Sequence, residues 1–158
     1  MKPSATAARS TSHATFVIER KYPTTKALVF GAWAEPTSKA RWFNGPPEHP
    51  TRDYSLDFRV GGREQVTTGP REAPHLYVAE YRDIVDAERI IYAYDMFIGE
   101  RRISVSLATV EFFADGKGTR MVFTEQAAFL DGYDDAGSRE HGTNWLFDKL
   151  GKSLEVAP

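Results

Sequence analysis

From Tyr54 to Ala127 the sequence repeats one pattern, in which a segment of alternating apolar and polar residues is followed by a short turn. Alternation with a period of two is typical of a strand that has one face in a core. The turns are Val60–Arg63, with its paired glycines, Asp86–Ala87, Gly99 and Asp115–Gly118. Because strands joined by such short turns pair in antiparallel fashion, this part of the chain predicts an antiparallel meander of about six strands.

Two short helical patterns precede the meander, after a first strand over residues 15–23. Thr24 or Thr25 is the expected N-cap of the first helix. Pro36 stands in the first turn of the second helix, where its missing N–H costs nothing. Residues 44–53 contain three prolines and therefore predict a loop.

One long helical pattern closes the chain, over residues 134–156. Asp134 or Asp135 is the expected N-cap, where a carboxylate also favours the positive end of the helix dipole. An apolar stripe at intervals of four residues predicts the buried face of this helix: Leu146, Leu150 and Leu154.

These patterns predict an α+β fold, with a curved antiparallel sheet of about six to seven strands wrapped on the long C-terminal helix and two short helices after the first strand. An antiparallel sheet of this length curls, and only the C-terminal helix is long enough to cover it. Because a curved sheet cannot close completely along the flanks of a helix, we expect an internal cavity. The polar residues 1–13 are expected to form a disordered tail, and residues 14–156 a single domain.

Composition narrows the classes of function. Twenty Lys and Arg against 22 Asp and Glu give a net charge of -2, so no electrostatic argument favours a nucleic acid or a membrane as partner. The absence of cysteine and the scattered histidines argue against a metal site, and no phosphate or dinucleotide motif suggests a cofactor. With no secretory signal and no apolar run near the ~18 residues of a membrane helix, we expect a cytoplasmic protein.

An ordered set of segments resembles a known family. The segments are ERKYP, VFGAW, ARWF, YSLDFRVGGRE, EYRDIVDAERIIYAYDM and ATVEFFADGKGTRMVFTEQAAFLDGYDD. Together with the C-terminal helix, over residues 15–154, they resemble the activator of heat-shock protein 90 ATPase homologue-like proteins of the START-like (SRPBCC) superfamily. The resemblance implies a helix-grip fold. It does not define a function, because the superfamily includes lipid carriers, hormone receptors, polyketide cyclases, ring-hydroxylase subunits and co-chaperone domains.

Strand parity places several tyrosines on the inner face of the sheet, at positions 54, 77, 81, 92 and 94. They form either a wet core, in which the hydroxyls bond to backbone, or the lining of a ligand cavity. The residues that we expect to contact a ligand are Trp42, Tyr54, Phe58, Tyr81, Tyr92, Tyr94, Met96, Ser104, Phe123, Glu125, His141 and Trp145.

Glu125 follows Met121 and Phe123 on the inner face of the last strand. A carboxylate held against apolar side chains has a raised pKa, which suits a general acid, and His141 of the C-terminal helix could approach it across the cavity. Glu125 and His141 are therefore the candidate catalytic pair. The alternative is structural: Glu125 pairs with Arg102 or Arg120, or lies at the solvent rim, and this alternative is favoured because structural ion pairs are commoner than catalytic carboxylates.

Trp42 and Phe43, beside the proline-rich loop, form either an exposed patch for a partner or a second copy of the chain, or a cap on the cavity mouth. The cap is the favoured interpretation.

Three functional hypotheses follow. The first is a protein that binds a small apolar or aromatic molecule in its cavity. A homodimer is compatible with this hypothesis. The second is a cofactor-free enzyme, cyclase-like or hydrolase-like, that uses Glu125 and His141. The third is a chaperone-interacting or stress-response module, as the resemblance implies.

Overall fold

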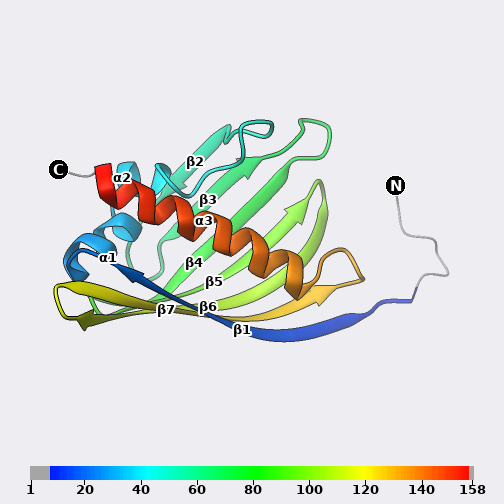
Figure 1. Cartoon of the computed structure of the whole chain (residues 1–158). Helices are drawn as coiled ribbons and strands as arrows, with labels where there is room; N and C mark the ends of the chain where they lie inside the picture. The colour runs from blue at the N-terminus through cyan, green and yellow to red at the C-terminus, as the bar shows by residue number, and fades with distance from the viewer. Residues whose placement is uncertain (1–7, 157–158) are drawn as a thin grey trace.

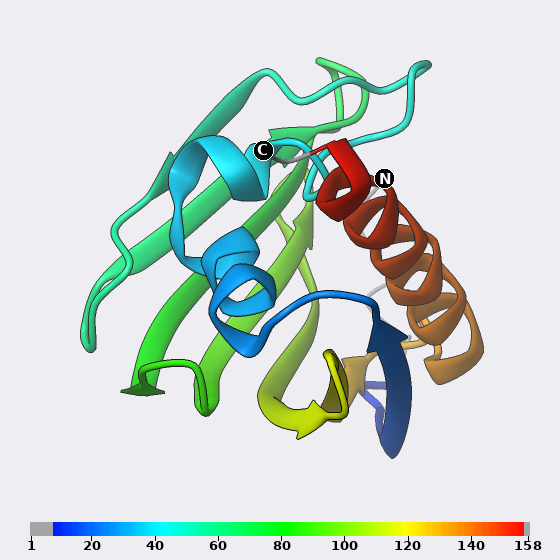
Figure 2. The same ribbon diagram turned by 60° about the vertical axis from the view of Figure 1, so that its left-hand side comes forward.

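The computed structural model of the chain describes residues 8–156. The elements are β1 (Thr11–Tyr22), α1 (Lys26–Ala34), α2 (Pro36–Ala40), β2 (Asp53–Leu56), β3 (Arg63–Thr68), β4 (His75–Val85), β5 (Arg89–Ile98), β6 (Arg101–Asp115), β7 (Gly118–Leu130) and α3 (Ala136–Val156). Figure 1 shows α3 lying across the concave face of one curved sheet, and Figure 2 shows α1 and α2 beside it on the same face. The α+β helix-grip architecture expected from the sequence is confirmed.

The sheet has seven strands in the order β1-β7-β6-β5-β4-β3-β2. From β2 to β7 each strand pairs with its neighbour in sequence, as a meander does. The exception is β1, which pairs antiparallel with β7, from Thr11 opposite Leu130 to Tyr22 opposite Thr119. The last strand before α3 is therefore held between β1 and β6, which places its inner face under the helix.

The first strand begins earlier than the sequence suggested. Residues 11–13 belong to β1 and pair with residues 128–130, although they were expected to lie in a disordered tail. Thr11, Ser12 and His13 are all exposed, so they carry no apolar alternation that would mark a strand. Their pairing arises because β7 continues past Ala127 and offers its backbone groups. Residues 1–7 of the expected tail lie outside the described residues.

Two of the helices, α1 and α3, begin at positions capped by a side chain, whereas α2 begins with Pro36 and has no side-chain cap. The side chain of Thr25 accepts a hydrogen bond from the backbone N–H of Leu28 at the start of α1. At the start of α3 the cap is Asp135, whose carboxylate accepts from the N–H of Ser138 at 2.8 Å. Of the expected apolar stripe of α3, Leu150 is fully buried, while Leu146 and Leu154 pack partly exposed against the core.

Strand parity predicted the inner face correctly. The tyrosines expected on the inner face of β4 and β5 are buried, as are the expected inner residues of β7. They are Tyr77, Tyr81, Tyr92, Tyr94, Met121, Phe123 and Glu125. The residues that alternate with them in the same phase on β4 and β6 are buried as well: Ala79, Ser104, Ser106 and Ala108. These strands therefore supply the floor on which the helices pack, and it carries both aromatic and polar side chains.

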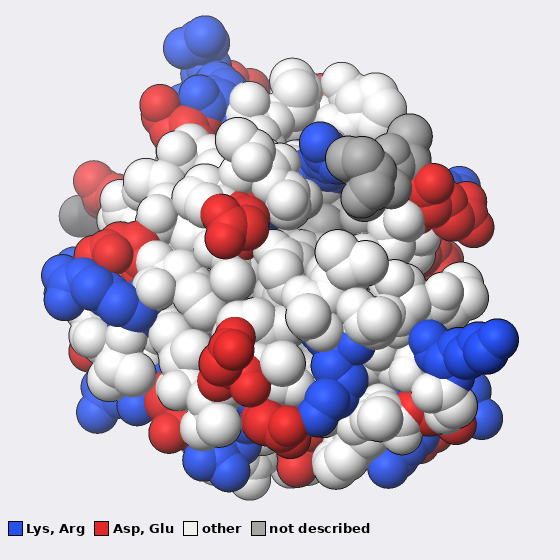
Figure 3. Space-filling view, turned by 90° about the vertical axis from the view of Figure 1, so that its left-hand side faces the viewer, with Lys and Arg blue, Asp and Glu red and all other residues white. Residues whose placement is uncertain are grey.

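None of the helices in the described range is long and apolar enough to cross a membrane. On the end of the molecule drawn in Figure 3, Lys and Arg side chains alternate with Asp and Glu, and uncharged residues lie between them. Neither sign of charge gathers into a patch on this face.

Candidate functional site

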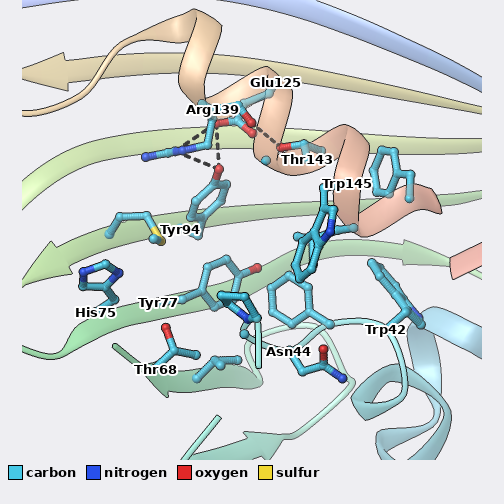
Figure 4. A pocket seen from close by; sticks show the side chains of 18 of the residues that line it. Trp42, Asn44, Thr68, His75, Tyr77, Tyr94, Glu125, Arg139, Thr143 and Trp145 are labelled. Carbon is cyan, nitrogen blue, oxygen red and sulfur yellow. Dashed lines mark hydrogen bonds and ion pairs between the residues drawn. The ribbon is translucent and has the colours of Figure 1, made fainter. Parts of the chain in front are cut away.

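A pocket of about 390 Å³ lies between the concave face of the sheet and α3. Its wall is contributed by β3, β4, β5 and β7, by α1 and α3, and by the loop after α2, and it includes nine aromatic side chains. The aromatic lining residues are Trp33, Trp42, Phe43, Tyr77, Tyr92, Tyr94, Phe123, Trp145 and Phe147. Figure 4 shows Tyr94, Glu125 and Arg139 together on one side of the pocket, with Trp42 and Asn44 away from them.

A hydrogen-bonded cluster around Glu125 forms the polar side. Three donors reach this carboxylate, and all of them bind Oε2: the hydroxyl of Tyr94 at 2.7 Å, the hydroxyl of Ser106 at 2.8 Å and Nη1 of Arg139 at 3.3 Å. The other oxygen, Oε1, is buried and has no hydrogen-bond partner among the described residues. Glu125 itself is completely buried.

Arg139 connects the start of α3 to the sheet. Its Nη1 donates to the hydroxyl of Tyr94 at 2.9 Å, while Nη2 donates to the hydroxyl of Ser104 at 2.7 Å and to Asp134 Oδ2 at 3.1 Å. Burial alone would lower the pKa of Arg139, but Tyr94, Glu125 and Asp134 more than compensate and raise it. Burial also raises the pKa of Tyr94, so this hydroxyl stays protonated and able to donate.

A second buried ion pair lies outside the pocket lining and joins α2 to β3. Nζ of Lys39, on α2, lies 2.7 Å from Oε1 of Glu64, on β3, and both side chains are fully buried. The hydroxyls of Tyr81 and Tyr54 donate to the same carboxylate at 3.1 and 2.9 Å. Burial lowers the pKa of Lys39, and the negative Glu64 partly offsets this effect.

Three of the five tyrosines expected on the inner face donate their hydroxyls to carboxylates. Neither the interpretation as a wet core nor the interpretation as a ligand lining predicted such partners. Tyr54 and Tyr81 donate to Glu64, and Tyr94 donates to Glu125. The hydroxyl of Tyr77 lies in the lining and has no partner that meets hydrogen-bond geometry in the described part of the chain. A wet core with hydroxyls bonded to backbone does not describe these side chains.

The pocket brings together seven of the twelve residues expected to contact a ligand. They are Trp42, Tyr92, Tyr94, Met96, Phe123, Glu125 and Trp145.

The other five do not line the pocket. Tyr54 and Tyr81 turn toward Glu64, and Phe58 packs edge-on against Phe30 and Tyr81. Ser104 lies behind the wall and accepts from Arg139. His141 is exposed, because two residues beyond Arg139 correspond to about 200° around the helix. The structure therefore does not bring His141 to Glu125.

The partner of Glu125 is Arg139, and not Arg102 or Arg120. Arg120 is adjacent to the inward Met121 and therefore points outward, where it pairs with Glu19. Arg102 and Ser104 are two residues apart on β6 and would be expected on the same face of the sheet. On β5, however, Met96 lies opposite Ser104 and the next residue, Phe97, lies opposite Arg102. Strand β6 therefore has a bulge at Ile103, which turns Arg102 to the outer face. It pairs with Asp95 on the outer surface.

A signal for Arg139 was present in the sequence. Stepping back along the buried stripe from Leu150 by seven and then four residues reaches Thr143 and Arg139, so the arginine shares the inward face of α3. Trp42 and Phe43 are not an exposed patch, because Trp42 is fully buried and both line the pocket. Among the described residues no group of three His, Asp or Glu side chains is placed to hold a metal ion.

Comparison with protein families identifies the family of this chain. The model of the family described as "Activator of Hsp90 ATPase homolog 1-like protein" matches residues 23–155. No protein with a curated description matches the sequence.

Solved structures of similar chains come from several bacteria. A protein of uncharacterised function from Rhizobium leguminosarum is 50% identical, with a TM-score of 0.90 over 95% of this chain and 99% of that one. A protein from Rhizobium loti is 40% identical, with a TM-score of 0.84 over 91% and 99% of the two chains. A Chromobacterium violaceum protein, 17% identical with a TM-score of 0.75 over 90% and 98%, shares the fold.

Proposed function

The chain belongs to the family of activator of Hsp90 ATPase homolog 1-like proteins, and from this premise we propose that it binds a small apolar or aromatic molecule between the sheet and α3. The observation that carries the proposal is the pocket itself, about 390 Å³ in volume and lined by nine aromatic side chains beside one polar cluster. This volume falls within the range of about 300–1,000 Å³ that is usual for small-molecule sites.

The arrangement of the lining supports binding of a mostly apolar molecule. Tyr77 and Tyr94 lie with ring centroids 4.9 Å apart, and Phe123 packs edge-on against Phe147 of α3 at 5.1 Å. Such rings offer large apolar surfaces that a planar ligand can cover. Hydrogen-bonding groups gather on one side, at Glu125 and Arg139, where they can fix the orientation of a ligand.

Two helical glycines provide a matched test. A Cβ added at Gly142, which lines the pocket from α3, or at Gly31, on α1 outside the lining, meets no atom within 4 Å. Gly142→Phe and Gly31→Phe therefore both add a side chain to a helix at a position where its Cβ meets no neighbouring atom. We expect wild-type protein and Gly31→Phe to bind the same compounds from an aromatic and lipid library, and Gly142→Phe to bind them at least about tenfold more weakly.

Binding is measured by isothermal titration calorimetry, and circular dichroism shows that both variants fold. Equal affinities in the two variants would place the ligand elsewhere and contradict the proposal. Failure of the wild-type chain to bind any compound of the library would contradict it as well.

The family description favours one further hypothesis, activation of the Hsp90 ATPase, through the match over residues 23–155. It is separable from ligand binding. If purified chain stimulates an Hsp90 ATPase, and Gly142→Phe stimulates it equally, a surface outside the pocket performs that function. If addition of the chain leaves the ATPase rate unchanged, the hypothesis is wrong for this chain.

A further inference from the structure

The uneven hydrogen bonding of Glu125 indicates which polar group a ligand presents. All three donors that reach the carboxylate converge on Oε2, and Oε1 receives none although it is buried. A buried acceptor without a donor costs about 1–3 kcal/mol, and such groups are rare in native structures. Because Glu125 belongs to the pocket lining, a donor within the pocket is the partner that would satisfy it.

The charges around this oxygen favour the same kind of group. The polar side contains two carboxylates, from Glu125 and Asp134, and one cation, Arg139. Both terminal nitrogens of Arg139 already donate to protein oxygens, at 2.7 to 3.3 Å. An incoming carboxylate would meet an occupied guanidinium and a surplus of negative charge, which disfavours an anion in a site of low dielectric.

The aromatic wall suits a cationic or neutral group equally. Tyr94 and Tyr77 both line the pocket, with ring centroids 4.9 Å apart and Tyr94 on the polar side (Figure 4). The guanidinium of Arg139 already lies over the Tyr94 ring, 5.6 Å from its centroid, so Tyr77 is the ring left to a ligand. The faces of aromatic rings carry negative potential and attract cations. They also pack well on uncharged aromatic surfaces.

We propose that the ligand has an apolar or aromatic body and a hydrogen-bond-donating, non-anionic polar end, an amine or a hydroxyl, that donates to Oε1 of Glu125. This inference rests on the proposed small-molecule function and specifies the class of compound. Both an amine and a hydroxyl can supply the donor that Oε1 of Glu125 does not receive from the protein. The two differ in charge, because only the amine is a cation, and this difference allows an experiment to distinguish them.

A series of probes with one body and different ends tests this directly. The four probes share a naphthalene ring with a two-carbon substituent. They are 2-(1-naphthyl)ethylamine, 2-(1-naphthyl)ethanol, 1-ethylnaphthalene and the acetate, the anion of 1-naphthaleneacetic acid. Their ends are a cationic donor, a neutral donor, no polar group and an anion. We expect the amine and the alcohol to bind the wild-type chain more tightly than the other two, by about tenfold for the amine, since hydrogen bonds to charged groups contribute more than neutral ones. The acetate should bind most weakly.

The variant Glu125→Gln tests the role of the carboxylate. Tyr94, Ser106 and Arg139 hold an acceptor at the position of Oε2, so the amide of glutamine would place its oxygen there and its NH₂ at the position of Oε1. We expect the amine to lose its advantage and the acetate to gain affinity. Met96→Leu, at a lining residue without a donor, is the control, and it should change all four affinities by a similar factor.

The outcomes separate the two proposals. If the acetate binds the wild-type chain as tightly as the amine, or if all four compounds bind equally, the head-group inference is overturned while the pocket function stands. If the library binds but none of the four probes does at 1 mM, the inference also fails by itself. If neither library nor probes bind, both proposals fail. Should Glu125→Gln not fold, the order of affinities in the wild-type chain still decides.

Discussion

Nζ of Lys39 lies 2.7 Å from Oε1 of Glu64, and neither side chain has exposed surface. The pair joins α2 to β3, and the ring centroids of Phe43 and Trp33 lie 4.5 and 5.1 Å from the ammonium group. A charge in such surroundings is tolerable only while its partner remains, because either ion alone would be buried without compensation. The pair therefore makes the position of α2, and of the loop that follows it into the pocket, depend on β3.

Lys39→Met is expected to lower the free energy of unfolding by about 3–5 kcal/mol, since it leaves the carboxylate of Glu64 buried without its cation. The double variant Lys39→Met/Glu64→Gln removes both charges. The hydroxyls of Tyr54 and Tyr81 bind different oxygens of Glu64, so in glutamine the amide oxygen can accept from one hydroxyl while the NH₂ donates to the other. The double variant should recover most of the loss. Urea unfolding followed by circular dichroism measures both changes.

An exposed ion pair serves as the control. Arg82 and Glu80 pair at 3.4 Å with side chains 61% and 41% exposed, so Arg82→Met should cost less than about 0.5 kcal/mol. A small cost for Lys39→Met, comparable to that of Arg82→Met, would show that the buried pair does not stabilise the fold.

The sequence predicted the strands and their inner faces better than the partners of the polar groups. Alternation identifies Phe123 and Glu125 as inward because a strand has only two faces. Which cation meets Glu125 depends instead on strand register and on the rotation of a helix, and one extra residue at Ile103 is enough to turn Arg102 outward. Lys39 was missed for the same reason, since its partner, Glu64, is 25 residues away and nothing local marks the pairing.

Arg139 is expected to be irreplaceable by lysine. Its two terminal nitrogens reach Tyr94, Glu125, Ser104 and Asp134 at once, and the single ammonium group of lysine cannot reproduce this planar fork. Arg139→Lys should therefore destabilise the fold by about 1–3 kcal/mol, the cost of leaving buried polar groups unsatisfied.

Arg102→Lys is the matched control, because Arg102 pairs with Asp95 where its side chain is 52% exposed. Thermal unfolding of the two variants beside the wild-type chain provides the comparison. Equal midpoints for Arg139→Lys and wild type would mean that the cluster on α3 needs only a positive charge.

Tryptophan fluorescence is expected to report ligand binding. Trp33, Trp42 and Trp145 all line the pocket, and only Trp145 is substantially exposed, at 39%. A bound molecule that covers Trp145 should reduce the quenching of fluorescence by acrylamide, whereas the two buried rings change little. In Trp145→Phe the protection by ligand should disappear while binding measured by calorimetry persists, and protection that survives this substitution would contradict the expected position of the ligand.

Stability is expected to fall as the pH drops below the ordinary pKa of histidine, about 6.5, through His75. Burial lowers the pKa of this side chain in the folded state, and the neighbouring His49, with its ring centroid 6.4 Å away, lowers it further. Since the unfolded chain then binds a proton more readily than the folded one, the contribution of His75 is complete above pH 6.5 and is lost as the pH falls toward the folded pKa.

Urea unfolding at pH 7.5 and pH 5.5 should therefore show a smaller loss of stability at the lower pH for His75→Gln than for wild type. His13→Gln, at an exposed position of β1, is the control, and a pH dependence in His75→Gln equal to that of the wild-type chain would show that other groups cause the acid loss.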